Sequence, residues 1–535
     1  MASIIKKIKK GKAYYYAVAS ARVDGKPRIV WQKYLGTIEA IIERAENAKP
    51  AKPKETVIFE AGGVAALLGI AQRLGLMELI NEQVPKRDQG PSVGHYMVLA
   101  ALNRALDPCS KLAIGDWYEQ TVLQRLWRFP KSAFSSPRFW DHMDMISETA
   151  IAAVQDRLAQ RIEQEFGLEA QTLLYDTTNF FTFISTVNDR NHLAQRGHSK
   201  AKRHDLRQVG LALLVTANDQ IPLFHRVYAG NRVDVSLFPS LVKELLARHQ
   251  NILGRRAEST LVFDKGNVSD EAMERIVVSN QHFVAALSAN RAEHLLSIPL
   301  SEFAPMPGLP GARAYSTEEI IWGKKLSAVV VYTESFFTQQ LNGVTHHLVQ
   351  CQKKLLDLEK SLIKWRKGKA RGKKPTVRGV KAGVNGILCA QFMKDLFKYT
   401  VEEEKGLPVL QYSLNHAALE RLSNERLGRT VLVSDRREWK PQEVISAYRS
   451  LAGVEESFKN MKNIDFLHWQ PAYHWTDQKL MVHGFYCVLA LTLASLAHKM
   501  AIQAGMDLSL HELLKDLTSI REVAVIYPQG VLAHP

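Results

Sequence analysis

One apolar, β-prone run carries a carboxylate in its middle: Leu173-Leu174-Tyr175-Asp176-Thr177-Thr178-Asn179-Phe180-Phe181. A second such run, Thr260-Leu261-Val262-Phe263, ends at Asp264. Periodicity around these two runs predicts five strands and two helices. The strands are expected at 171–184, 207–217, 221–229, 259–264 and 282–288, and the helices near 235–249 and 269–280. Three strands followed by helix, strand, helix and strand predict an α/β fold built on a mixed sheet.

A third acidic residue, Glu455, lies in a predicted helix from Tyr448 to Lys462. Seven residues span almost two helical turns, so Tyr448, Glu455 and Lys462 are expected on one face. Carboxylates from two strand ends and one helix are the oxygen ligands that hard divalent cations take. Two such ions about 4 Å apart clamp the attacking and leaving oxygens of a phosphodiester. Taken singly, an acidic residue after a strand is more often part of a turn or a helix cap than a metal ligand. Without the two aspartates, the predicted helix from Tyr448 to Lys462 would be interpreted as an amphipathic helix with a charged stripe.

The local sequence around these residues resembles that of the bacterial insertion-sequence DDE transposases of the Tyr-Arg-Glu-Lys signature group. The resemblance rests on short segments that occur in the family's order. They are Tyr175-Asp176-Thr177-Thr178, Gly197-His198-Ser199-Lys200, Lys202 through Gln208, Ala229-Gly230-Asn231, Val262 through Gly266, and Tyr448 through Lys462. The matching register selects Glu455 over Glu456. The chain departs from the signature at Leu451, where the family has arginine; Arg449 lies two residues earlier.

The resemblance implies an RNase H-like catalytic core and a specific set of site residues. Asp176, Asp264 and Glu455 would be both catalytic residues and metal ligands, for two Mg²⁺ ions or Mn²⁺ in their place. The DNA-binding residues would be Lys202, Arg203, Tyr448 and Lys462. Asp205 is expected to pair with a cation rather than to bind metal. The implied partners are double-stranded DNA, as transposon terminal repeats and as target, and a second copy of the chain in a synaptic complex.

Composition agrees with a nucleic-acid partner. The 535 residues carry a net charge of +16 with a pI near 9.5, and cationic proteins gain affinity for DNA by releasing condensed counterions. The four cysteines are scattered, which argues against a zinc site or a disulfide framework and fits a reducing cytoplasm. The resemblance implies a bacterial, nucleoid-associated location within it. The most apolar segment, Phe485 to Ala497, is shorter than a membrane span needs. We expect it to be a buried helix, with no membrane partner.

The chain is too long for one core, and composition shifts suggest six segments. An N-terminal β-hairpin region (1–52) contains the turn signal Asp24-Gly25. Contact with DNA phosphates and simple surface solubility explain the cations near this hairpin almost equally well. The remaining segments are a helical domain expected to bind DNA ends (53–165), the first part of the core (166–294), an insertion domain (295–408), the second part of the core with the Glu455 helix (409–500), and a C-terminal tail (501–535).

Two alternatives share many of these features. A DDE-fold DNA nuclease without strand transfer would need every metal-binding residue named above. A non-catalytic DNA-binding descendant would keep the basic surface but is expected to lose a carboxylate. A dinucleotide-binding enzyme is disfavoured because no Gly-x-Gly-x-x-Gly follows a predicted strand.

Overall fold

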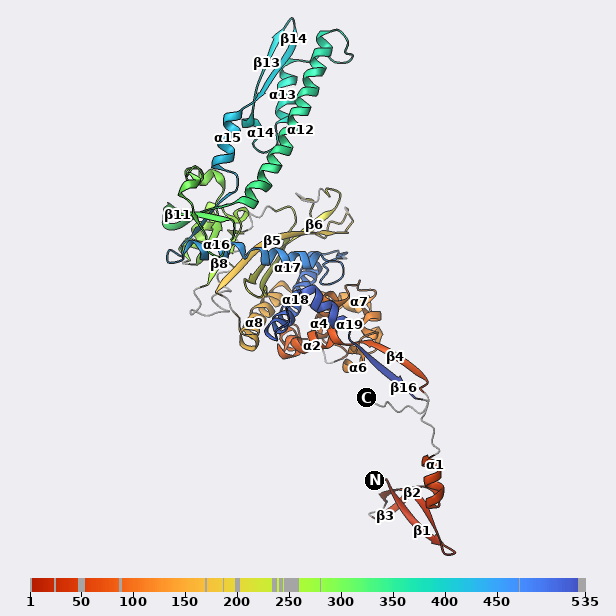
Figure 1. The fold of residues 1–535 in the computed structure, drawn as a ribbon. Coiled ribbons are helices and arrows are strands. Elements are labelled where there is room, and N and C mark those ends of the chain that lie inside the picture. The colour runs from red at the N-terminus through yellow and green to blue at the C-terminus, as the bar shows by residue number, and fades with distance from the viewer. Residues whose placement is uncertain are drawn as a thin grey trace. The chain divides into compact units, whose positions relative to one another are not determined.

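A computed structural model describes the chain except for residues 1, 24–25, 47–52, 86–88, 169–170, 186, 198–202, 233–237, 240–243, 245–258, 280, 471 and 528–535. The chain divides into two compact units: Met1–Phe59 together with Arg521–Pro535, and Glu60–Ile520. Figure 1 labels the helices and strands of both units.

The first unit contains a three-stranded antiparallel sheet followed by a helix. The elements are β1 (Ala2–Lys9), β2 (Lys12–Val23), β3 (Lys26–Gly36) and α1 (Ile38–Glu46). Pairing of β2 with β3 as far as Val23 and Lys26 confirms the predicted hairpin, while Asp24 and Gly25 lie outside the described residues. The sequence did not predict β1, whose lysines obscure the alternation. A separate ladder joins β4 (Glu55–Glu60) to β16 (Arg521–Ile526).

The second unit begins with helices that pack around a long helix from near the carboxyl end. These are α2 (Gly62–Arg73), α3 (Leu76–Gln83), α4 (Val93–Leu106), α5 (Ile114–Glu119), α6 (Leu123–Trp127), α7 (Ser136–Asp144) and α8 (Glu148–Phe166). The long helix α18 (Asp477–Gln503) contacts α4, α2, α8 and β7, and α19 (Leu510–Ser519) packs on α2. The helices predicted at 53–165 are present, but α18 completes their apolar faces, and their binding to DNA ends stays a prediction. The prediction of a tail at 501–535 is wrong, since α19 and β16 are both paired with earlier elements.

In the described part of the chain, α18 is the only individual helix that is long and apolar enough to cross a membrane. Helices α2 and α3 reach that length and hydropathy only when taken together, and they are bent by 56° relative to each other. Of the most apolar 18-residue window of α18, 94% is buried inside the protein. The expectation of a buried helix over Phe485–Ala497 is confirmed: the apolar composition serves packing against α4 and β7.

A nine-stranded mixed sheet in the order β10-β11-β12-β15-β9-β8-β5-β6-β7 forms the centre of this unit. Five strands and one helix confirm the sequence prediction: β5 (Thr172–Thr182), β6 (Arg207–Thr216), β7 (Pro222–Ala229), β8 (Thr260–Phe263), β9 (His282–Ala286) and α10 (Asp270–Val278). The helix expected at 235–249 lies largely outside the described residues. β8 runs parallel to both β5 and β9, whereas β5, β6 and β7 form an antiparallel meander.

The boundaries predicted for the insertion domain are wrong at both ends. Three of its strands extend the main sheet: β10 (Ala304–Pro305), β11 (Ala312–Ile321) and β12 (Lys324–Thr333), with α11 (Glu293–Leu296) before them. A separate core begins only at α12 (Glu334–Arg366) and runs through α13 (Val377–Ile387), α14 (Met393–Leu396), β13 (Phe397–Glu404), β14 (Leu407–Leu414) and α15 (His416–Glu425). We call residues 334–427 the arm. The chain returns to the sheet in β15 (Arg429–Ser434), which pairs with β12 and β9.

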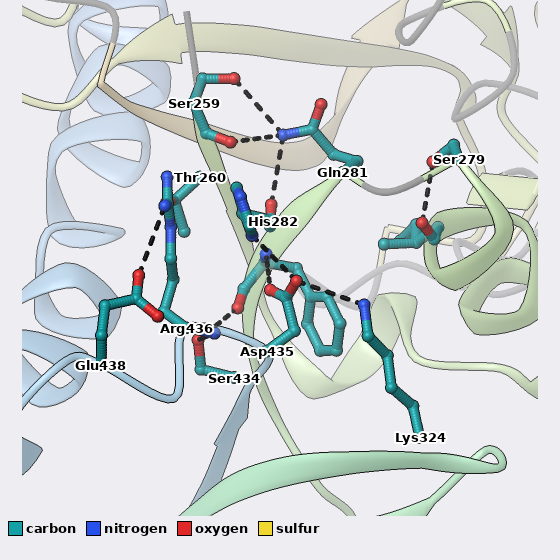
Figure 2. Close-up of polar contacts among 12 residues, drawn as sticks. Ser259, Thr260, Ser279, Gln281, His282, Lys324, Ser434, Asp435, Arg436 and Glu438 are labelled. Carbon is teal, nitrogen blue, oxygen red and sulfur yellow. Dashed lines mark hydrogen bonds and ion pairs between the residues drawn. The ribbon is translucent and has the colours of Figure 1, made fainter.

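A polar cluster around Asp435 fixes the end of β15 (Figure 2). The Asp435 side chain is 3% exposed and lies 2.9 Å from His282 Nδ1 and 3.5 Å from Lys324 Nζ. It also accepts a hydrogen bond of 2.9 Å from the backbone N–H of Phe283. A buried carboxylate needs such partners, because leaving it unpaired costs several kcal/mol. The cluster anchors the turn that leads into α16 (Pro441–Arg449), the helix that carries Tyr448.

Candidate active site

The two aspartates selected from the sequence lie on neighbouring parallel strands. Tyr175 of β5 pairs with Phe263 of β8 in register, so Asp176 and Asp264 follow at equivalent positions on the two strands. Neighbouring strands lie about 4.8 Å apart, and residues in register point to the same side of a sheet. Both aspartates are half-buried. The sheet therefore presents two carboxylates side by side.

An aromatic row behind the two aspartates explains why these strands form here. The rings of Tyr175 and Phe238 lie 4.7 Å apart, those of Phe238 and Phe263 4.8 Å apart, and Phe263 contacts Phe283 at 6.4 Å. All four side chains are fully buried. Because side chains alternate along a strand, burying Tyr175 and Phe263 turns the next residue of each strand to the opposite face.

The predicted single helix from Tyr448 to Lys462 is two helices. α16 ends at Arg449, and α17 (Ala452–Lys462) begins after Ser450 and Leu451. The N–H of Leu451 donates to the Tyr448 carbonyl and that of Gly453 to the Ser450 carbonyl, which are i→i−3 bonds of a tighter turn. The expectation of one continuous face through Tyr448, Glu455 and Lys462 is therefore wrong, although all three residues still lie near β5 or β8.

Tyr448 of α16 is bonded to one of the two aspartates. Its hydroxyl donates a 2.7 Å hydrogen bond to Asp264 Oδ1. Burial raises the pKa of Tyr448 most strongly, and the hydrogen bond to Asp264 together with the negative charges of Asp264, Glu455 and Asp176 raises that pKa further. The negative charges of all three carboxylates are therefore felt at this phenol, although Asp264 alone is bonded to it.

The structure distinguishes Glu455 from its neighbour Glu456. Glu455 acts on the pKa of Tyr448, and Glu456 does not. Glu456 instead pairs with Lys459 at 3.0 Å on the solvent side of α17. Both side chains are exposed. The choice of Glu455 over Glu456 as a site residue stays a prediction, which the pairing of Glu456 with Lys459 favours.

Lys462 at the end of α17 contacts the same face of β5 as Asp176. Its Nζ donates to Thr178 Oγ1 at 2.7 Å and lies 5.4 Å from the centre of the Phe180 ring. Residues 176, 178 and 180 share one side of the strand. Sequence reasoning missed the contribution of Thr178, which positions this ammonium. The signal available was its spacing of two residues from Asp176.

The other two predicted DNA-binding residues precede β6. Lys202 lies outside the described residues. Arg203 is exposed and forms a two-point ion pair with Asp205, with Nε and Nη2 at 2.8 and 2.7 Å from the carboxylate oxygens. The bond to Arg203 lowers the pKa of Asp205 to about 2. Asp205 thus pairs with a cation, as expected.

The donor chemistry of the site fits magnesium, but the described side chains do not form a finished ligand set. Asp176, Asp264 and Glu455 offer the carboxylate oxygens that Mg²⁺ takes. Asp264 uses Oδ1 for Tyr448, which leaves the acceptor capacity of Oδ2. Among the described residues, no three His, Cys, Asp or Glu side chains are grouped closely enough to hold a metal ion. The expectation that the carboxylates already share one ligand pocket is not met, and their role as metal ligands stays a prediction.

A cavity of about 630 Å³ opens beside Asp264 and Tyr448. Its walls come from the ends of β9 and β15, from α16 and from the base of the arm. Four cationic side chains line it: Lys265, Arg426, Arg429 and Arg449. Leu451, at the position where the family signature has arginine, is 8% exposed. Arg449, two residues before Leu451, is one of the four cations that line the cavity.

No protein-family model matches the chain, and no curated protein sequence matches it. Among solved structures, the chain shows a distant similarity to the piggyBac transposase synaptic complex with hairpin DNA, determined by cryo-electron microscopy. The similarity covers 85% of this chain and 79% of that chain, with 11% sequence identity and a TM-score of 0.40.

Proposed function

We propose that this protein is a DDE transposase of an insertion sequence, which cleaves DNA at the element's ends and joins the freed 3′-hydroxyl to target DNA. One observation carries the proposal: Asp176 and Asp264 stand side by side on parallel strands, and Tyr448 is hydrogen-bonded to Asp264. The charge of Glu455 contributes to the raised pKa of Tyr448 and supports its inclusion in the site. The strand order β9-β8-β5-β6-β7, with only β5, β8 and β9 parallel, supports an RNase H-like core.

Each side chain has a role in this proposal that follows from its charge and contacts. Asp176, Asp264 and Glu455 would hold two Mg²⁺ ions, which when bound lower the pKa of the attacking hydroxyl and neutralise the leaving oxygen. Tyr448 orients the Asp264 carboxylate through its hydrogen bond. Lys462 offers an ammonium to a DNA phosphate at the edge of the site, where Thr178 fixes its position.

The whole chain supports double-stranded DNA as the partner. A net charge of +16 favours a polyanion, and four cations line the cavity beside Asp264. A homodimer holding two element ends and a cytoplasmic, nucleoid-associated location complete the proposal.

The test is a strand-transfer assay with labelled duplexes taken from the DNA that flanks the gene. The wild-type chain is expected to cleave and to join these ends in Mg²⁺ or Mn²⁺. Asp176→Asn and Glu455→Gln should abolish both steps while duplex binding is kept. Glu456→Gln is the matched control, because its carboxylate is turned toward Lys459, and it should retain activity.

Three results would change the assignment. Cleavage without joining would indicate a nuclease that lacks strand transfer. Duplex binding with no cleavage under any metal would indicate a non-catalytic descendant. Full cleavage by Asp176→Asn would refute the site itself.

A further inference from the structure

The three-stranded sheet of the first unit has two unlike faces. Strand register assigns Ile5, Tyr14, Tyr16, Val18 and Tyr34 to one face. On that face Val18 is 1% exposed, the ring of Tyr34 contacts those of Tyr14 and Tyr16, and Lys7 reaches across to Gln32 at 3.2 Å. Several side chains of this face thus contact one another, although Tyr34 is still 52% exposed.

The opposite face, which we call the alanine face, is open. Its central strand contributes Tyr15 opposite Lys6 and then Ala17, Ala19 and Ala21, a row of alanines too small to fill the space between the outer strands. The outer strands rim this row with larger side chains. On β1 these are Ile4, Lys6 and Ile8, and on β3 they are Lys26, Arg28, Trp31 and Lys33. Ile4, Ile8 and Trp31 are 66, 71 and 51% exposed.

Charge on this sheet has one sign. Strands β1, β2 and β3 contain no acidic residue. Residues 1–46 hold ten lysines and arginines against four acids, three of which belong to α1. Among the described residues, no hydrogen bond or ion pair is made by the side chains of Lys6, Lys26, Arg28 or Lys33. An apolar trough rimmed by unpaired cations is complementary to a polyanion that also offers apolar edges.

Helix α4 of the second unit is a poor candidate for reading a DNA end. α4 has thirteen of its fourteen residues buried, and the apolar faces of α2 and α8 are covered within the same unit. A recognition helix needs a face free to enter a groove. The alanine face is free in this sense.

We propose that the alanine face binds duplex DNA in the major groove and reads the element's ends, an inference that rests on the proposed function. The outer strands of a three-stranded sheet lie about 10 Å apart, and a major groove about 12 Å wide admits strands laid in this way. Lys6, Arg28 and Lys33 contact phosphates or guanine edges. Trp31 and Ile4 make the apolar contacts that thymine methyl groups accept.

The test compares variants of the full chain that differ only in which face of the sheet they alter. Binding is measured by fluorescence anisotropy, without metal, to a labelled 40-base-pair duplex from the gene's flank and to a mixed-sequence duplex of about equal length. Lys6→Gln and Lys7→Gln remove the same charge at adjacent positions on opposite faces. Trp31→Ala and Tyr34→Ala form the matching aromatic pair.

Lys6→Gln is expected to weaken binding about tenfold and to reduce the salt slope of log K by about one, whereas Lys7→Gln leaves both near wild type. Trp31→Ala should lower the preference for the flanking duplex, and Tyr34→Ala should not. Far-ultraviolet circular dichroism confirms that each variant is folded.

Equal effects of the two members of each pair would overturn the inference. A second result would also overturn the inference. If Lys6→Gln or Trp31→Ala changes the molar mass measured by light scattering and leaves the DNA affinity unchanged, the alanine face binds a second copy of the chain. If the wild type binds no duplex, the proposed function itself fails. If the wild type binds and cleaves the duplex and the variants of both faces bind it with wild-type affinity, only this inference fails.

Discussion

The hydroxyl of Tyr448 provides a direct test of how the Asp264 carboxylate is held. Because the pKa of Tyr448 is raised by burial and by the surrounding carboxylates, the phenol stays protonated and keeps donating well above pH 8. Tyr448→Phe removes the donor with little change in volume. A hydrogen bond to a charged group contributes about 1.5–3 kcal/mol, so we expect the rate of end cleavage to fall about ten- to a hundredfold.

The measurement for Tyr448→Phe is single-turnover cleavage as a function of Mg²⁺ concentration. A positioning role predicts that excess metal restores part of the rate, since the ion then orients the freed carboxylate. Between pH 8 and 10 the wild type and Tyr448→Phe should have cleavage rates that depend on pH in the same way, because the phenol does not ionise in this range. A variant with wild-type kinetics at all metal concentrations would contradict this role.

At the same scale, the sequence predicted the positions of the carboxylates better than their partners. Asp176 and Asp264 were located from strand periodicity, and Glu455 from the register of the signature. The bond from Tyr448 to Asp264 could not be predicted, because it depends on the break at Ser450 and Leu451. Gly453 takes part in this turn, but a single glycine within a helical pattern does not by itself signal a helix end, and α17 is held over β5 by tertiary packing.

Among the elements, helical glycines show where packing leaves no room. A Cβ added at Gly94 of α4 would lie 2.5 Å from the carbonyl oxygen of Met77, a backbone atom that cannot easily move. A Cβ added at Gly69 of α2 meets nothing within 4 Å. Gly69→Ala should therefore stabilise the protein by up to about 1 kcal/mol through helix propensity. Gly94→Ala should destabilise it by about 1–3 kcal/mol by forcing α3 and α4 apart.

Urea unfolding followed by tryptophan fluorescence measures both changes, and each variant is the control for the other. A gain of stability in Gly94→Ala would mean that α3 shifts freely against α4. A loss in Gly69→Ala would mean that its exposed position is in contact with something outside the described residues.

Strands and helices were predicted correctly from the sequence where each has a clear hydrophobic periodicity within its own residues. β5 to β9 and α10 were found because each is a short run with its own alternation or helical spacing. The insertion boundaries failed for the opposite reason. β11 and β12 look like any exposed hairpin, and only their pairing with β15, across the whole arm, shows that they extend the main sheet.

At the scale of the whole molecule, stability should depend on two buried histidines. Burial holds the pKa of His474 and of His483 well below the ordinary range, and the nearby cations Lys111 and Arg104 lower both further, with Lys479 also acting on His474. Both imidazoles are therefore neutral in the folded state. Below about pH 6.5 the unfolded chain gains protons that the folded chain does not, so stability falls with acid by about 1.4 kcal/mol per pH unit for each histidine.

The check on this pH dependence is the urea midpoint at pH 7.5, 6.5 and 5.5. His474→Phe removes one of the two groups while keeping a flat ring against Trp140, so its midpoint should change less between pH 7.5 and 5.5 than that of the wild type. His347→Gln, at an exposed position of α12, should follow the wild type. Parallel curves for the wild type and His474→Phe would show that His474 is protonated in the folded state.

The division of the chain into units could not be predicted from the sequence. The helices before residue 166 have apolar faces that can be recognised in the sequence. The sequence of these helices does not indicate that α18, more than 300 residues later, covers those faces. A long apolar helix and a set of amphipathic helices are visible in the sequence separately, whereas their partnership is a property of the folded chain alone.

The arm is inserted into an antiparallel pair of strands, and that position predicts that the rest of the second unit folds without it. Tyr332 of β12 pairs with Arg429 of β15, and the N–H of Thr333 donates to the carbonyl of Gly428 at 3.0 Å. The two ends are thus as close as those of a β-hairpin. The arm has its own core, in which Leu355 and Val384 are fully buried. Replacing residues 334–427 by Asn-Gly should close the hairpin with a two-residue turn.

The shortened chain should unfold cooperatively and lose helical circular dichroism in proportion to the helices removed. Its stability should drop by a few kcal/mol, because Phe337 no longer packs on Tyr332 and Gln340 no longer accepts from the Gly428 N–H. End cleavage should fall as well, since Phe336 and Gln340 form a wall of the cavity beside Asp264. A point variant in the arm core, Val384→Ala, controls for simple loss of stability and should keep activity. If the shortened chain does not fold, the sheet depends on the arm and the insertion is structural.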